Sequence, residues 1–375
     1  MGRGRALSLE LGDARVAVRS DDERLLEWLA EALAPSFSVT AGGEDGVVVE
    51  VGSEPVKAGV RADRLLPCFA LESQLVQMAA QVERGRIVLE DPDWGIRLAL
   101  EPGRVRIWEL EGHGILRSVV LRVVRELALT QALARGAMQL HASAVDVRGH
   151  GVAFAGPKEA GKTTTAAWIV ACGIASLIAN DRVLASRDEG RLLITGVPTL
   201  VVLRAGTIER LPAQFRTIPD VERPVRLTLD EYLAAGAVHG FIREPRQVPL
   251  SPPQLLHELG ASASRRAPLE CLALIELDPA AGEFDVEPRG REEAARAADA
   301  FSFGWPSRPS DRTVFDWVLN GGPIPGSPGP EPDAPNRVAP VELDGVRVVR
   351  LRVGPDFTRS PAAPRRLIRS LVPDR

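Results

Sequence analysis

The sequence predicts an α/β domain that follows a smaller N-terminal α+β accessory domain. Three observations support this class. Short apolar runs alternate with turns before residue 112, apolar residues recur at helical spacing from Ile115 to Ala134, and the apolar run Gly151–Ala155 leads through a glycine-containing loop into the helix-forming run Thr163–Ala171. With 375 residues, the chain exceeds one average domain, so two domains are expected.

The N-terminal α+β domain is expected to span residues 1–112. The strand-like run Leu7–Val18 precedes a helix with an acidic start. Turn signals at 91–93 and 101–103 separate the last three expected strands, which predicts a meander. The expected elements after the first run are a helix at Asp21–Leu33 and strands at Ser36–Thr40, Val47–Val51, Arg86–Leu89, Ile96–Leu100 and Val105–Trp108. Nothing in this domain carries recognisable chemistry.

A connecting helix is expected at residues 113–136, and the α/β domain at residues 137–320. The first two strands of this domain should form a hairpin. Its expected strands are Leu140–Val147, Gly151–Ala155, Ala175–Ala179, Val183–Ser186, Leu192–Thr195, Thr199–Leu203 and Leu272–Leu277, with a late helix at Arg291–Phe301.

Three segments break the α/β pattern. Residues at about 205–267 are rich in Arg, Pro and Glu, which predicts an insertion or lid. Residues 321–340 are rich in Gly and Pro and predict a linker. Residues 341–375 should contain a last strand, Val346–Val353, and a basic tail interrupted by prolines.

The loop between Gly151–Ala155 and the following helix matches the pattern G-x-x-x-x-G-K-[ST]. Glycines in such a loop let backbone N–H groups surround phosphates, and the helix N-terminus favours negative charge. Lys162 would reach the β- and γ-phosphates, and the Thr163 hydroxyl would bind Mg²⁺. The expected nucleotide-binding residues are Gly156, Pro157, Lys158, Glu159, Ala160, Gly161, Lys162, Thr163 and Thr164. The sequence therefore predicts binding of ATP, or another nucleoside triphosphate, with Mg²⁺.

The positions of two further residues indicate a role beside the loop. His141 lies on the strand expected to pair with Gly151–Ala155, and Asp181 follows the next strand along the chain. Ligands of open α/β sheets bind at the carboxyl ends of strands, so Asp181 should face the γ-phosphate or its Mg²⁺. Taken alone, each has an ordinary structural explanation, a hydrogen-bonded core histidine and a strand-end aspartate. Arg182 fits either a phosphate contact or a solvated neighbour, and Glu276 fits either the acidic end of a Walker B strand or an exposed strand end.

Together, these elements resemble the catalytic domain of the HPr kinase/phosphorylase family. The resemblance rests on the segments His141–Val145, Gly156–Thr163 and Ala179–Arg182, and it covers about residues 137–203, with weaker similarity at 270–299 and in the last strand. It implies an HPr-kinase-like P-loop domain with a mixed sheet, in which the histidine and the aspartate are catalytic. The family also includes kinases that phosphorylate lasso-peptide precursors.

The chain departs from this family at three points. Asn180 replaces one aspartate of the family's Asp-Asp pair, Lys158 and Glu159 occupy loop positions where small or apolar residues are commoner, and the glycine-rich signature loop has no copy. These departures bear on HPr recognition and on phosphorolysis, and they leave Mg-nucleotide binding intact.

The resemblance implies an ATP-dependent kinase that transfers the γ-phosphoryl group to a hydroxyl, for which a serine of a peptide or small protein is the first candidate. The expected catalytic residues are Asp181, His141 and Lys162, and the expected Mg²⁺ ligands are Thr163 and Asp181. A small-molecule hydroxyl is an alternative acceptor. A second alternative is that the chain is a nucleotide-binding regulatory protein with little turnover. The N-terminal domain and residues 205–267 would select the acceptor.

Composition excludes several other classes. The net charge of −4 and the 5% aromatic content argue against nucleic acid as a partner, and no apolar run approaches the ~20 residues that span a bilayer. Three widely spaced cysteines and the lack of an apolar segment after the basic N-terminus favour a cytoplasmic protein. A homo-oligomer is compatible with the sequence, which specifies neither the number of copies nor a preference for ATP over GTP.

Overall fold

The computed structural model describes most of the chain and divides it into two compact units. One unit contains the described part of residues 1–135 and helix α8 (Val314–Asn320), and the other contains the described parts of 136–238, 242–303 and 338–375. The described residues are 5–372 except 44, 53, 72–73, 84, 93–94, 112–115, 205–216, 220–225, 229–246, 291, 294–295, 297–312, 322–323 and 325–342.

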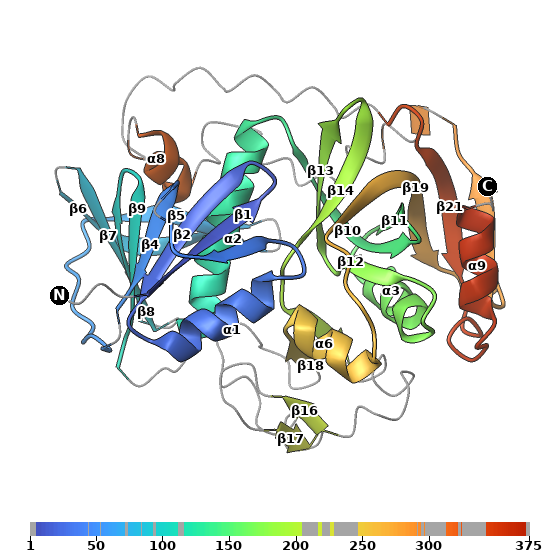
Figure 1. Cartoon of the computed structure of the whole chain (residues 1–375), viewed down its shortest axis with the longest axis horizontal. Helices are drawn as coiled ribbons and strands as arrows, with labels where there is room; N and C mark the ends of the chain where they lie inside the picture. Colours follow the sequence, from blue (N-terminus) through green and yellow to red (C-terminus); the bar gives the residue numbers. More distant parts are fainter. Residues whose placement is uncertain are drawn as a thin grey trace. The chain divides into compact units, whose positions relative to one another are not determined.

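The first unit is built on a nine-stranded mixed sheet in the order β3-β1-β2-β4-β9-β8-β7-β6-β5 (Figure 1). β2–β4 and β4–β9 pair in parallel, and the remaining neighbours are antiparallel. The strands are β1 (Arg5–Leu11), β2 (Ala14–Ser20), β3 (Ser38–Ala41), β4 (Val47–Val51), β5 (Arg64–Leu71), β6 (Gln74–Glu83), β7 (Arg86–Asp91), β8 (Ile96–Glu101) and β9 (Arg104–Glu109).

Helices α1 (Glu23–Leu33), α2 (Leu116–Ala134) and α8 form one layer on this sheet. α2 contacts both other helices as well as β2 and β4. The Asp22 side chain caps α1 by accepting from Arg24 N–H (2.9 Å), and Leu25, Leu29 and Leu33 point into the core at helical spacing.

A buried ion pair fixes an irregular segment of the first unit. Glu90 is 5% exposed and accepts from the guanidinium of Arg97, its cross-strand partner, with Nε 2.8 Å away. The same carboxylate accepts from the N–H groups of Gly59 (2.8 Å) and Val60 (3.2 Å). Burial raises the pKa of Glu90, but the N–H donor of Gly59 and the Arg97 guanidinium outweigh it, so the net pKa is lowered.

The second unit contains an eight-stranded mixed sheet whose pairings close a ring. β10 pairs with β11 and β13, β13 with β14, β14 with β19, and β19 with β11 in parallel. β12 pairs with β10, and β21 joins β19 to β20. The strands are β10 (Met138–Val147), β11 (His150–Ala155), β12 (Ser176–Ala179), β13 (Arg182–Asp188), β14 (Arg191–Val197), β19 (Arg266–Leu277), β20 (Phe284–Pro288) and β21 (Arg347–Val353).

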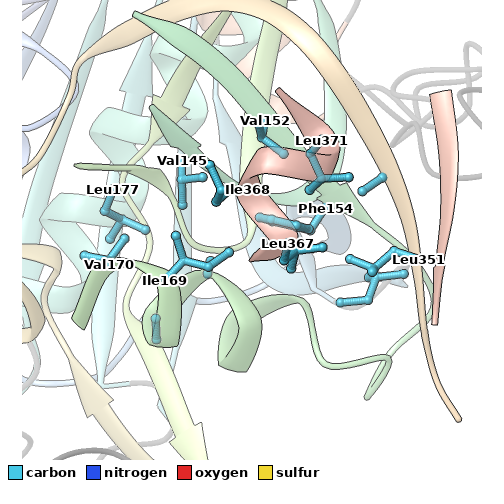
Figure 2. Close-up of a cluster of buried hydrophobic side chains, with 14 of the residues drawn as sticks. Val145, Val152, Phe154, Ile169, Val170, Leu177, Leu351, Leu367, Ile368 and Leu371 are labelled. Atoms are coloured by element: carbon cyan, nitrogen blue, oxygen red, sulfur yellow. The ribbon is translucent and has the colours of Figure 1, made fainter. Parts of the chain in front are cut away.

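Two hydrophobic clusters lie on the two faces of this sheet, an outer one and an inner one, and the inner one combines alanines with larger side chains such as Leu140 and Ile194. The inner cluster includes Ala142, Ala153, Ala155, Ala185 and Ala267. On the outer face, residues of the sheet pack against α3 (Lys162–Ala171), α6 (Pro252–Leu259) and α9 (Ala363–Leu371). Figure 2 shows part of this outer cluster, in which Val145, Phe154, Ile169, Val170, Leu177, Leu367 and Ile368 come together.

Several expectations for the first unit need correction. The run Leu7–Val18 is two strands joined by a turn at Gly12 and Asp13, where Gly12 has φ +60°. β5 and β6 were not expected, although the other strands and α1 are where the sequence predicts them, within about two residues. The meander of β7, β8 and β9 is confirmed.

The second unit also differs from expectation. β18 (Gln247–Leu250) and α6 fall inside the expected insertion, yet Leu250, Leu255 and Leu259 are buried in the outer cluster. The C-terminal segment is no separate tail, because β21 pairs with β19 inside the sheet and α9 covers the cluster. α8, expected in the second domain, packs with the first unit, where Val318 O accepts from Gly103 N–H (2.7 Å).

The remaining elements are short or lie partly outside the described residues. β15 (Val201–Arg204) pairs with β18, and β16 (Thr217–Pro219) pairs with β17 (Arg226–Thr228). The expected helix Arg291–Phe301, the linker at 321–340 and most of 205–246 lie largely outside the described residues. None of the helices in the described part of the chain combines the length and apolar character needed to span a bilayer.

Candidate functional site

The glycine loop, residues 156–161, connects the end of β11 to the start of α3. Gly156 has no room for a side chain, because a Cβ there would lie 2.4 Å from the Ile275 carbonyl oxygen of β19. Gly161 is the N-cap of α3 with φ +92°, a conformation that favours glycine. Because the cap residue is glycine, it supplies no side-chain acceptor to the first-turn N–H groups of α3. These groups can therefore serve an anionic ligand.

Glu159 and Ala160 give the loop its shape, one through a positive φ and the other through burial. Glu159 has φ +71°, which costs an L-residue about 1–2 kcal/mol. Ala160 is buried, and its N–H donates to Pro157 O (3.2 Å), which tightens the loop into a turn. Pro157, Lys158 and Glu159 are exposed at the tip. The loop thus keeps a fixed, partly strained shape.

Lys162 is the buried cation of the site. Its side chain is folded back over the loop, where Nζ donates to Gly156 O and Pro157 O, each at 2.9 Å. Burial lowers the pKa of Lys162, and the nearby Asp181 carboxylate opposes this shift only in part. A lysine held among carbonyl groups in this way can exchange these acceptors for phosphate oxygens.

Asp181 lies at a bend in what is in effect one long strand. β12 and β13 both run antiparallel to β10, with Ala144 opposite Ala179 and His141 opposite Arg182, and the register of β12 shifts by one residue beyond Ala144. Across the bend, Ala142 N–H donates to Asp181 O (3.1 Å), and the Ser143 hydroxyl donates to Asn180 O. β10 therefore holds the backbone of the bend from one side.

The bend brings the Asp181 carboxylate to His141, with 3.2 Å between Oδ1 and Nε2. Arg182 lies near the other carboxylate oxygen, with its Nε 3.9 Å from Oδ2. Burial raises the pKa of Asp181. The hydrogen bond and charge of His141, together with the charges of Arg182 and Lys162, lower this pKa by more than burial raises it, so the net pKa lies below the usual value. The carboxylate is ionised at neutral pH and 41% exposed, so it can accept a proton from a bound group.

These donor groups suit Mg²⁺ bound together with phosphates. No cluster of three or more His, Cys, Asp or Glu side chains able to hold a metal occurs among the residues that the structure describes. Mg²⁺ needs no such cluster, because it binds through one or two carboxylates, phosphate oxygens and water. Thr163 is half-buried in the first turn of α3, and it borders the same narrow crevice as Asn180, the neighbour of Asp181. Thr163 thus supplies one hydroxyl in the first turn of α3, and Asp181, whose charge acts on Lys162, supplies one carboxylate.

Most of the expected site residues come together around the start of α3. His141, Asp181 and Lys162 form one electrostatically coupled group, the glycine loop and Thr163 lie beside it, and Thr164 is half-buried in the first turn of α3. Arg182, for which the sequence left two readings, is 11% exposed and contributes to this group.

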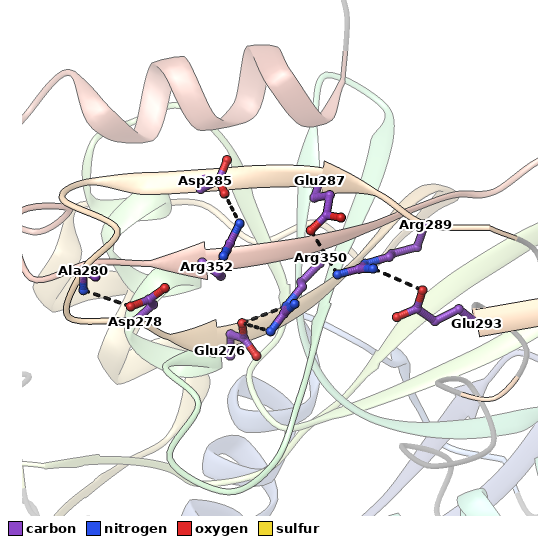
Figure 3. Close-up of polar contacts among 9 residues, drawn as sticks. All are labelled: Glu276, Asp278, Ala280, Asp285, Glu287, Arg289, Glu293, Arg350 and Arg352. Carbon is purple, nitrogen blue, oxygen red and sulfur yellow. Dashed lines mark hydrogen bonds and ion pairs between the residues drawn. The ribbon is translucent and has the colours of Figure 1, made fainter.

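Glu276 is held away from this group by an ion pair. Figure 3 shows Glu276 of β19 bonded to Arg350 of β21, with Nη2 2.6 Å from Oε1. The same face of the sheet carries Arg352 paired with Asp285, and Arg289 paired with Glu287 (3.0 Å) and Glu293 (3.4 Å). Because the Glu276 carboxylate is already paired with Arg350, the interpretation as an exposed strand end is favoured over a Walker B role.

Comparisons with known proteins add little to this geometry. No protein-family model matches the chain, and no curated protein matches it. Among solved structures, the chain is similar to the Hpr(Ser) kinase/phosphatase from Coxiella burnetii, with 12% identity and a TM-score of 0.27 over 62% of this chain and 88% of that one. A likeness this weak carries no argument about fold or activity, so the functional interpretation depends on the site itself.

One residue at the site was missed from the sequence. Leu277, the last residue of β19, lies against Gly161 and is 58% exposed. Its only signal in the sequence is an apolar residue that ends a strand after the charged Glu276, a pattern too common to single it out.

Proposed function

We propose that the protein is an ATP-dependent kinase that transfers the γ-phosphoryl group to a hydroxyl. The observation that carries this proposal is the coupling of three groups, in which Lys162 at the start of α3 interacts with the Asp181 carboxylate and His141 bonds that carboxylate. Phosphoryl transfer asks a protein mainly for positioning and charge neutralisation, and this group offers a cation, a base and a helix N-terminus together.

The residues have separate tasks in this proposal. First-turn N–H groups of α3 and the Lys162 ammonium bind the β- and γ-phosphates. Asp181 accepts the proton of the attacking hydroxyl, and His141 holds the carboxylate in place through its 3.2 Å contact. The charge of Arg182, near the other carboxylate oxygen, helps to keep Asp181 ionised.

Mg²⁺ fits beside these residues through the Thr163 hydroxyl and the Asp181 carboxylate. When bound, it neutralises charge on the β- and γ-phosphate oxygens. Asn180 offers an amide where a second carboxylate would be able to act as a base, so in this proposal the base is Asp181 alone.

A serine of a peptide or small protein is the proposed acceptor, and a small-molecule hydroxyl is the alternative. We further propose that the protein works in the cytoplasm, as one chain or as a homo-oligomer, without nucleic acid or membrane.

Transfer from γ-labelled ATP tests the proposal. The full chain with Mg²⁺ is offered serine peptides and small hydroxyl compounds, and wild type is compared with Asp181→Asn. We expect the variant to lose at least about 100-fold in transfer, the scale of general-base catalysis, while its affinity for ATP measured without Mg²⁺ changes by less than about threefold. Asp188→Asn is a matched control, because Asp188 ends β13, the strand that follows Asp181, is exposed and makes only a 3.9 Å surface contact with Arg266.

The outcomes separate the proposal from its rivals. If Asp181→Asn transfers label as well as wild type does, Asp181 is not the base and the mechanism is wrong. A different outcome is that wild type binds ATP yet transfers label to no acceptor and releases no labelled phosphate by hydrolysis. If Lys162→Ala also abolishes binding, a nucleotide-dependent regulatory protein is the better description.

A further inference from the structure

Leu277 is an unusual residue for its place in the fold. Among the described residues, it and Leu65 are the large hydrophobic side chains that remain exposed, at 58% and 65%. Leu65 lies on β5, an edge strand of the first unit. Leu277 lies instead at the carboxyl end of β19, the parallel neighbour of β11, where the glycine loop begins.

The contact between Leu277 and the loop is close. A Cβ at Gly161 would lie 2.9 Å from Leu277 Cδ2, so the glycine leaves the space that this side chain occupies. The strand end that carries Leu277 is fixed, since Asp278 N–H donates to Val353 O (3.0 Å) and the Asp278 carboxylate accepts from Ala280 N–H (2.9 Å). Leu277 is thus held over the loop with more than half of its surface open.

The two neighbours of β11 offer opposite chemistry at this edge. On the β10 side lie His141 and Asp181, which are polar and coupled to Lys162. On the β19 side lies Leu277. Neighbouring strands are ~4.8 Å apart, so about 10 Å separates the two sides. The two ends of a nucleoside triphosphate differ in the same way, with a charged γ-phosphate at one end and a flat apolar base face at the other.

We infer that Leu277 is a nucleoside contact, which packs against the base of a purine nucleoside triphosphate while its γ-phosphate lies beside Asp181. This inference rests on the proposed function, because it places the reacting phosphate on the β10 side. An aliphatic side chain recognises the face of the base and none of its hydrogen-bonding edge, so ATP and GTP gain equally from it.

Calorimetric titration of the full chain with Mg²⁺ tests the inference, with ATP, GTP and inorganic tripolyphosphate as ligands. Leu277→Ser removes the apolar surface at an exposed position, where no cavity forms. We expect about five- to tenfold weaker binding of ATP and GTP, from the apolar area that the base would cover, and unchanged binding of tripolyphosphate. Leu277→Met should bind all three as wild type does. Leu65→Ser removes an equally exposed leucine from the other unit and should change nothing.

Each result decides one question. Equal weakening of tripolyphosphate and ATP by Leu277→Ser would show that the leucine supports the loop, and unchanged ATP binding would show that the base lies elsewhere. Either result overturns the inference and leaves the proposed kinase standing. If wild type binds neither ATP nor tripolyphosphate, the proposed function fails and the inference fails with it.

Discussion

Replacement of Lys162 by methionine should separate the stability of the protein from its affinity for nucleotide. The ammonium is buried, its pKa is lowered by burial, and its two protein acceptors are the loop carbonyls of Gly156 and Pro157. Loss of these two hydrogen bonds costs about 2 kcal/mol. Removal of a buried charge returns a comparable amount or more, because the penalty for burying an ion is several kcal/mol. Methionine keeps most of the apolar packing, so we expect the free energy of unfolding to stay within about 1 kcal/mol of wild type or to rise.

The same replacement should weaken nucleotide binding strongly. A charge-assisted contact to phosphate contributes about 1.5–3 kcal/mol, so Lys162→Met should bind Mg-ATP about 10- to 150-fold less tightly. Urea unfolding measures the first effect, and calorimetric titration measures the second.

The pH dependence of unfolding gives an independent check. Because the folded pKa of Lys162 lies below its unfolded value of 10.5, the unfolded chain binds the proton more tightly, and wild-type stability should gain as the pH rises towards 10.5. The variant should lack this gain. Destabilisation of the variant by more than about 2 kcal/mol, with ATP affinity unchanged, would refute this reasoning and identify Lys162 as a structural part of the loop.

Single substitutions at His141, Glu159 and Glu90 should change the pH profile of activity or the stability of the fold. In His141→Asn, the pKa of Asp181 should rise, so the acidic limb of the pH profile of kcat/KM should move to higher pH; an unmoved limb would mean that His141 does not act through Asp181. Glu159→Gly should raise the free energy of unfolding by up to about 1 kcal/mol, because glycine relieves the positive φ, whereas Glu159→Ala should not, and equal urea midpoints for the two would contradict this. Glu90→Gln should cost about 2–3 kcal/mol and speed hydrogen exchange at Gly59. Since the folded pKa of Glu90 is lowered, its contribution exists at neutral pH and is lost as the pH falls below 4.5, and the variant should lack that acid-dependent loss.

The sequence predicted the parts of the site that depend on local geometry. The glycine loop, α3 and the β10–β11 hairpin are encoded by neighbouring residues, so spacing alone located them. The contact between His141 and Asp181 could also be anticipated, because both positions follow from strands that flank the loop. Their catalytic roles remain predictions.

Elements that depend on distant partners were missed. The sequence around α9 contains Pro361 and Pro364 and predicts a basic tail interrupted by prolines, yet Pro364 lies in the first turn of the helix, and Leu367, Ile368 and Leu371 line its buried face. β5 and β6 show no clear alternation of apolar and polar residues, and pairing defines them as strands, β5 with β6 and β6 with β7. The closure of the second sheet into a ring depends on β19, whose two halves pair with different strands, and no local pattern records that.

This ring has a consequence for how the protein tolerates change. Its inside is filled by buried apolar side chains, among them the alanines Ala142, Ala153 and Ala267 and larger residues such as Leu140 and Ile194. Enlargement of one of these alanines would cost about 1–3 kcal/mol, because the strands on all sides are already joined. It should therefore be about as harmful as the milder truncations of large buried side chains, which cost about 2 kcal/mol or more. Substitutions should therefore be tolerated more readily at the strand ends and loops at the rim of the ring than on its inside.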